Sequence, residues 1–195
     1  LKYSQNFNIS IIGSNNIKYE NANDYNAHDT LLCIAQKMTI NQSNRKFSNS
    51  EIYDRFRSRI MFPIFNTSSK VIAFGGRVFG VDDPAKYMNS PETPLYHKSE
   101  IFYGLNLSRD IIRKENYAIL VEGYTDVIQL FQADIKNVIA VSGTAFTNQH
   151  VNQIRRLTSK VFLAYDGDSA GTNATLRAGY ALLKGGVEPK IIEYL

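Results

Sequence analysis

Hydrophobic positions in the second half of the chain alternate between two periodicities. Four short runs are apolar over most of their length: AILVEG at 118–123, NVIAVSG at 137–143, KVFLAYDGD at 160–168 and EPKIIEYL at 188–195. Between them, apolar residues recur at helical spacing within three stretches, which are 124–133, 147–157 and 170–186. Apolar strands that alternate with helices predict a parallel sheet with helices on both faces. We therefore predict an α/β fold for residues 117–195.

The first half of the chain has a different pattern. RIMFPIF at 59–65 and VIAFGGRVFG at 71–80 predict two strands joined by a polar turn. Residues 84–104 predict a long irregular surface segment, and a helix is expected at about His28 to Met38. Residues 1–116 are thus expected to form a mixed α+β lobe that precedes the parallel sheet.

Composition narrows the class of protein. The chain has 195 residues, 44% of them hydrophobic, which suffices for one good core or two small lobes. Its single cysteine, Cys33, excludes an internal disulfide and a cysteine-based zinc site, and we expect it in a helix core. No apolar run approaches the ~18 residues of a membrane span, and the N-terminal residues lack a signal-peptide pattern. We therefore expect no membrane partner.

The net charge of +4 is concentrated in the middle of the chain. Residues 45–118 hold twelve Lys or Arg against eight acidic residues, while the segments before and after are balanced. A basic segment beside a neutral one that bears carboxylates suits a polyanionic partner.

Acidic residues gather where the predicted strands end. Glu122 ends the first strand, Asp126 lies one helical turn later, and Asp166 and Asp168 follow the third strand. Ligands of parallel α/β sheets bind beyond the carboxyl ends of the strands, so neighbouring first and third strands would bring these carboxylates together. Oxygen donors without His or Cys favour Mg²⁺ or Mn²⁺. Helix capping accounts equally well for Asp168 alone, but not for Asp166 together with Glu122.

Two of these motifs carry a family resemblance. VEGYTD at 121–126 and YDGDSAG at 165–171 resemble the Toprim domain of primases, topoisomerases and related nucleases. Four further segments closely resemble the central RNA polymerase domain of bacterial DnaG-type primases: YDRFRSRIMFPIF at 53–65, VIAFGGRV at 71–78, KYMNSPETPLYHKS at 86–99 and FYGLNLSRDII at 102–112. The resemblance runs from about Glu51 to Leu195 and is poor over residues 1–50.

The resemblance implies a fold and an activity. The fold is a Toprim-like parallel sheet flanked by helices, preceded by a basic mixed α+β lobe. The activity is synthesis of short RNA primers on single-stranded DNA from ribonucleoside triphosphates. Glu122, Asp166 and Asp168 would be catalytic metal ligands for Mg²⁺ or Mn²⁺, with Asp126 as a helper.

Positive groups of the middle segment are expected to bind template and nucleotide. The candidates are Arg57, Arg59, Arg77, Lys86, Asn89 and Lys98. Arg77 follows Gly75 and Gly76, which we take as a turn that admits a phosphate close to the backbone. Three tyrosines either stack on unpaired bases or pack internally: Tyr87, Tyr96 and Tyr103. Ser142, Gly143 and Thr144 either line the site or form a strand-to-helix turn capped by Thr147.

The sequence departs from the resembled family in two respects. Primases of this family carry an N-terminal zinc-binding domain and a further acidic cluster after the strand at 188–195, and neither is in this sequence. We therefore expect a fragment or truncated primase with an incomplete Toprim domain. A replicative helicase would be a partner through regions outside this chain. The expected location is the bacterial cytoplasm or an organelle of bacterial ancestry.

Two alternatives stay open at this stage. One is a Toprim nuclease or topoisomerase, which would hydrolyse or rejoin DNA. The other is a non-catalytic fragment that binds single-stranded DNA through its basic segment.

Overall fold

The computed structural model describes residues 55–141 and 143–192. These residues divide into two compact units, each considered by itself. The first contains 55–64 and 71–96, and the second contains 65–70 and 97–192 apart from residue 142. The expected helix at His28 to Met38 and the core role of Cys33 lie outside the described residues.

Three strands form the sheet of the first unit, in the order β1-β2-β3. They are β1 (Arg59–Phe65), β2 (Val71–Val78) and β3 (Tyr87–Asn89). The predicted strand pair and its turn are confirmed: the Asn66 side chain accepts backbone N–H bonds from Ser68 and Lys70, both at 3.0 Å, and so closes the loop. The prediction of irregular structure throughout 84–104 is wrong at β3, which pairs antiparallel with β2.

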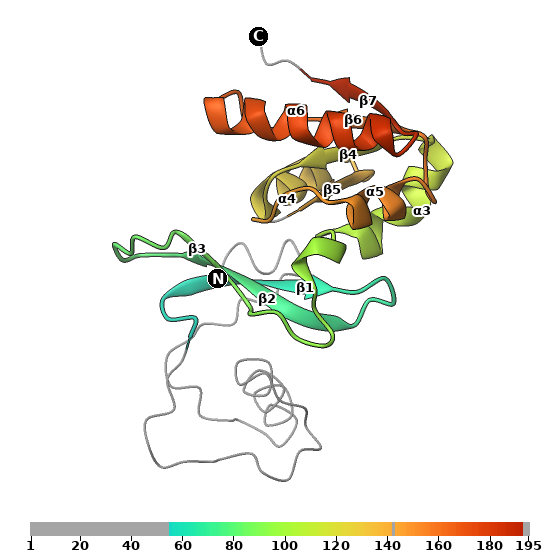
Figure 1. Ribbon diagram of the computed structural model, residues 1–195. Coiled ribbons are helices and arrows are strands. Elements are labelled where there is room, and N and C mark those ends of the chain that lie inside the picture. Colours follow the sequence, from blue (N-terminus) through green and yellow to red (C-terminus); the bar gives the residue numbers. More distant parts are fainter. Residues whose placement is uncertain (1–54, 142, 193–195) are drawn as a thin grey trace. The chain divides into compact units, whose positions relative to one another are not determined.

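A four-stranded parallel sheet organises the second unit, in the order β5-β4-β6-β7 (Figure 1). Its strands are β4 (Ala118–Val121), β5 (Val138–Ala140), β6 (Lys160–Leu163) and β7 (Glu188–Ile191). Its helices are η1 (Lys98–Glu100), α3 (Leu105–Glu115), α4 (Tyr124–Gln132), α5 (Asn148–Ile154) and α6 (Ser169–Lys184). The four strands and the three helices between them match the predicted runs. The first and third strands, β4 and β6, are neighbours in the sheet, which is the condition under which the carboxylates were expected to converge.

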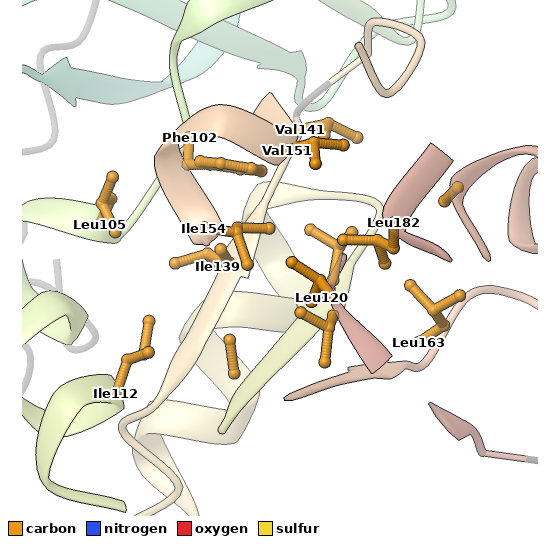
Figure 2. Packing of buried hydrophobic residues seen from close by; sticks show 14 of the residues in the cluster. Phe102, Leu105, Ile112, Leu120, Ile139, Val141, Val151, Ile154, Leu163 and Leu182 are labelled. Atoms are coloured by element: carbon orange, nitrogen blue, oxygen red, sulfur yellow. The ribbon is translucent and has the colours of Figure 1, made fainter. Parts of the chain in front are cut away.

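Side chains of β4 alternate between two cores, one on each face of the sheet. Ala118 and Leu120 join the larger cluster with Leu163 of β6 and Leu182 of α6, as Figure 2 shows for the three leucines. Val121, on the other face, packs in a smaller cluster that includes residues of α4. Helices therefore cover both faces, as the continuous apolar runs predicted.

Helix α3 was not predicted. It buries Leu105, Ser108 and Ile112, and the Ser108 hydroxyl donates to the Val138 carbonyl at 2.7 Å. This packing places α3 with the parallel sheet, in the compact unit that also holds residues 65–70. Within the described part of the chain, no helix combines the length and the apolar character that crossing a membrane requires.

Candidate functional site

Glu122 and Asp166 lie beyond the carboxyl ends of two neighbouring strands. Leu120 of β4 is in register with Leu163 of β6, so the chain leaves the sheet at both places side by side. The backbone N–H of Asp166 donates to Oε1 of Glu122 at 3.3 Å. The strand ends thus bring together the two residues that capping could not explain.

A glycine at the start of α6 makes this approach possible. A Cβ atom built on Gly171 would lie 2.1 Å from the carbonyl oxygen of Asp166 and 3.0 Å from Oε1 of Glu122. No side chain fits in that space without displacing the backbone. Gly171 therefore lets the loop after β6 fold back against Glu122.

The two remaining aspartates cap helices. Asp168 is the N-cap of α6 and accepts the Gly171 N–H through Oδ1 at 2.7 Å. Asp126 lies in the first turn of α4 and accepts the Gly123 N–H through Oδ2 at 2.9 Å. Each bond occupies one carboxylate oxygen and fixes the orientation of the side chain.

The charge of Glu122 is disfavoured where it lies. Partial burial raises the pKa of Glu122 above its ordinary value, the N–H of Asp166 opposes this rise, and the charges of three aspartates add to it. Those aspartates are Asp166, Asp168 and Asp126. Glu122 thus experiences the negative charges of all three aspartates, and a cation beside it would relieve this repulsion.

Charge repulsion around Glu122 does not by itself make a metal-binding site. Across 55–141 and 143–192, no three or more His, Cys, Asp or Glu side chains are grouped so that they could hold a metal ion. The donor set nevertheless fits Mg²⁺ or Mn²⁺, because it consists of carboxylate oxygens at one sheet edge. Gly143, expected near the site, has a left-handed φ of 81°, and Ser142 lies outside the described residues.

Among the basic candidates, Arg77 is exposed on β2 and carries an aromatic partner. Its guanidinium carbon lies 5.5 Å from the centre of the Tyr87 ring on β3. The expectation of a turn at Gly75–Arg77 is wrong: these residues are inside β2 and pair with Asn89, Met88 and Tyr87. The aromatic and the positive charge nonetheless form one exposed surface, suited to a base and its phosphate.

Arg59 has an internal role instead. Its side chain is 1% exposed, pairs with Asp83 at 2.6 Å and donates to the Ala85 carbonyl at 2.7 Å. A guanidinium occupied in this way holds the loop before β3 and is not presented to a ligand. This placement argues against direct contact between Arg59 and nucleic acid.

The other candidates differ in exposure and in unit. Arg57 and Lys86 are exposed and Asn89 is half-buried, all in the first unit, while Lys98 is half-buried in η1 of the second. Tyr96 is buried, and the Tyr103 ring packs edge-on against Tyr124 at 4.7 Å. The packing alternative therefore holds for these two tyrosines, and base stacking stays a hypothesis for Tyr87 alone.

Three residues that contact or neighbour the predicted site residues escaped sequence reasoning. Asp83 lies 24 positions from Arg59, too far for any local pattern to pair them. Tyr165 immediately precedes the DGD motif and Gly171 lies three residues after it. This proximity was the sequence signal that could have identified both residues. Tyr165 is buried, and its hydroxyl has no hydrogen-bond partner among the described residues.

Comparison with known families decides the assignment. Residues 2–109 match the family described as DNA primase catalytic core, N-terminal domain. The chain belongs to this family. Residues 116–193 match the Toprim domain. The first match extends across the first fifty residues, where the resemblance in sequence was poor.

Solved and curated primases cover the chain closely. The DNA primase of Staphylococcus aureus (strain COL) is 43% identical over 150 residues, which is 77% of this chain and 25% of the relative. The Aquifex aeolicus primase (zinc-binding and RNA polymerase domains) has a TM-score of 0.80 at 33% identity and covers 99% of this chain and 46% of its own. A DnaG primase catalytic domain bound to single-stranded DNA has a TM-score of 0.70 at 34% identity, covering 98% and 54%. The chain spans about a quarter of the length of the curated relative.

Proposed function

We propose that this chain is a catalytic part of a DNA primase, which synthesises short RNA primers on single-stranded DNA during replication. The 3′ hydroxyl of one ribonucleotide attacks the α-phosphate of the next, and pyrophosphate leaves. The observation that carries the proposal is the contact between Glu122 and Asp166 across the ends of β4 and β6, in a chain of the primase family.

Each carboxylate has a proposed role. Glu122, Asp166 and Asp168 would hold Mg²⁺ or Mn²⁺, and Asp126 would support them from α4. Such an ion would offset phosphate charge and lower the pKa of the attacking hydroxyl. Asp168 and Asp126, which cap helices, keep a fixed orientation before any ligand arrives. This limits the side-chain entropy that is lost when a ligand binds.

The first unit would contact the polyanion. Arg77, with Tyr87 beneath it, is the strongest candidate because the pair is exposed and can meet a phosphate and a base together. Arg57, Lys86, Asn89 and Lys98 stay candidates for template or triphosphate binding. Support comes from the neighbour solved with single-stranded DNA.

Further partners and the location stay proposals. Ribonucleoside triphosphates follow from the reaction, and a replicative helicase follows from the resemblance alone. The relative from Staphylococcus aureus supports a bacterial replication protein in the cytoplasm, and the organellar alternative receives no such support.

The match of residues 2–109 to a primase domain disfavours the nuclease and topoisomerase alternative, which gives that segment no role. A DNA-binding part that lacks catalysis is the alternative that the experiment must separate. Its distinguishing property would be DNA binding that does not depend on a divalent cation.

The test is Mn²⁺ binding by calorimetry, followed by primer synthesis on single-stranded DNA. An Asp166→Asn, Asp168→Asn double variant should lose Mn²⁺ binding and keep its thermal unfolding transition, because Asn caps a helix about as well as Asp. Asp134→Asn, at an exposed position outside the site, is the matched control and should bind normally. Mn²⁺ binding that survives the double substitution would contradict the metal role, and cleavage of the supplied DNA would favour a nuclease.

A further inference from the structure

One face of helix α5 holds a run of three backbone carbonyl groups in the segment that contains η1. The donor side chains recur every third residue, so they lie on one side of the helix. Each bonds to a different carbonyl of the run, and the pairs are Thr147 with Ser99, Gln153 with Glu100, and His150 with Ile101. None of the three residues of η1 is buried. Burial of its own side chains therefore does not fix η1, and these hydrogen bonds can.

The partners of His150 define which of its ring nitrogens carries the proton. Nδ1 accepts the backbone N–H of Thr147 at 3.1 Å, so the proton is on Nε2, which donates to the Ile101 carbonyl at 3.3 Å. The ring is fully buried, and the Phe102 ring packs against it with centroids 4.5 Å apart. Burial lowers the pKa of His150 to about 4, and hydrogen bonds with the backbone of Ile101 and Lys98 oppose this shift. The neutral ring thus uses both nitrogens to join the start of α5 to the segment around η1.

The held segment lies beyond the carboxyl end of β5. Tyr103 and Ala140 form an antiparallel bridge, with N–H to carbonyl distances of 2.8 and 3.1 Å. Because the bridge is antiparallel, the residues before Tyr103 continue in the direction in which β5 points, and this leads to η1 and Lys98. Strand β5 neighbours β4, so Lys98 comes to the same edge of the sheet as Glu122. Of the positively charged candidates, Lys98 is the one in the same compact unit as the carboxylates.

We propose that three side chains of α5 position η1 so that Lys98 meets the triphosphate of a nucleotide bound at the carboxylates. The positioning residues are Thr147, His150 and Gln153. The binding of a nucleotide by Lys98 rests on the proposed function. Attachment of η1 to α5 reduces the conformational freedom that the Lys98 backbone would lose on binding, so its loss should weaken binding without any change of charge.

The first experiment needs no ligand and measures the attachment of η1. Trypsin cleaves after lysine, so its rate of cleavage between Lys98 and Ser99 in the folded chain reports local opening of η1. Thr147→Asp keeps a helix cap but loses the hydroxyl donor to Ser99, whereas Thr147→Ser keeps both. Loss of one hydrogen bond should speed this cleavage by about two- to tenfold in Thr147→Asp, and Thr147→Ser should be cleaved like the wild type. Equal rates in the two variants would overturn the inference.

The second experiment measures GTP affinity in the presence of Mn²⁺ and tests whether the attachment acts through Lys98. Gln153→Met should weaken GTP binding by about two- to tenfold, and Gln149→Met, the same substitution at an exposed position of α5, should not. In a Lys98→Met background, Gln153→Met should have no further effect, because the group that it positions is gone. A loss of equal size in both backgrounds would show a general structural effect and would overturn the positioning role.

The two readouts separate this inference from the proposed function. Faster cleavage of Thr147→Asp than of Thr147→Ser, in a chain whose GTP binding does not change in Lys98→Met, would support the attachment of η1 and contradict the proposed role of Lys98. GTP binding that depends on Lys98 but is unaffected by Gln153→Met would support the proposed function and overturn the positioning inference.

Discussion

Replacement of Gly171 by alanine tests whether a close backbone approach builds the carboxylate site. The new Cβ would lie 2.1 Å from the Asp166 carbonyl oxygen, about 1.3 Å short of the 3.4 Å at which ordinary contact begins. The obstructing atom is backbone and has no rotamer to change. Either the DGD loop or the first turn of α6 must move, and Oε1 of Glu122, 3.0 Å from the same Cβ, must move as well.

The magnitude follows from two opposing contributions. Overpacking at a rigid position costs about 1–3 kcal/mol, with occasional larger values. Alanine in a helix gains up to about 1 kcal/mol over glycine. Gly179 in the same helix provides the matched control, because its Cβ would meet only Leu163 at 3.7 Å, which is ordinary contact. Gly179→Ala should therefore show the helix gain alone.

Thermal unfolding and Mn²⁺ calorimetry together measure the effect. The helix gain is common to both variants, so they should differ in unfolding free energy by the overpacking cost, about 1–3 kcal/mol, which corresponds to about 2–12 °C in Tm for a chain of this size. Gly171→Ala should also weaken Mn²⁺ binding, and Gly179→Ala should not. Should Gly171→Ala match Gly179→Ala in both Tm and Mn²⁺ affinity, the close approach would have no part in building the site.

Two further predictions concern other parts of the chain. Arg77→Ala should weaken binding to single-stranded DNA and reduce the salt slope of that binding by about 1, since one fewer phosphate contact releases fewer counterions; an unchanged slope would remove Arg77 from the interface. Burial lowers the pKa of His150 to about 4 from an ordinary 6.5, so the unfolded chain takes up a proton that the folded chain refuses. Folding stability should therefore decline below pH 6.5 by up to about 1.4 kcal/mol per pH unit. In Tm measured against pH, His150→Gln should flatten this decline, whereas His97→Gln, at an exposed position, should not. Parallel Tm profiles for wild type and His150→Gln would refute the role of His150.

Sequence patterns predicted the parallel sheet because β4, β5 and β6 are largely buried on both faces and therefore apolar along most of their length. They missed α3, whose buried positions Leu105, Ser108 and Ile112 include a serine that donates its hydroxyl to a carbonyl of β5. They also placed a turn at Gly75–Arg77, because two glycines locally favour one. Pairing with β3 overrides that preference. Gly76 also lies close to Phe56, because an added Cβ would approach its ring to 2.9 Å.

Sequence patterns predicted that the site lies beyond the strand ends, but they did not predict most contacts of its residues. Its position follows from topology, and the capping role of Asp168 follows from the residues after it. The roles of Arg59 and Gly171 depend on atoms that folding brings together, namely Asp83 for one and the Asp166 carbonyl for the other. Such contacts have no local signature in the sequence.

The four carboxylates differ in their surroundings, because two lie at helix starts and two lie beyond strand ends. Asp126 and Asp168 each accept a backbone N–H at the start of a helix, so the fold fixes the orientation of their side chains without any ion. Glu122 accepts the Asp166 N–H at the longer distance of 3.3 Å, and burial and the charges of the aspartates raise its pKa. A cation therefore has most to gain at Glu122, since it would relieve a cost that the fold leaves in place there, while the two capped aspartates hold the frame around it.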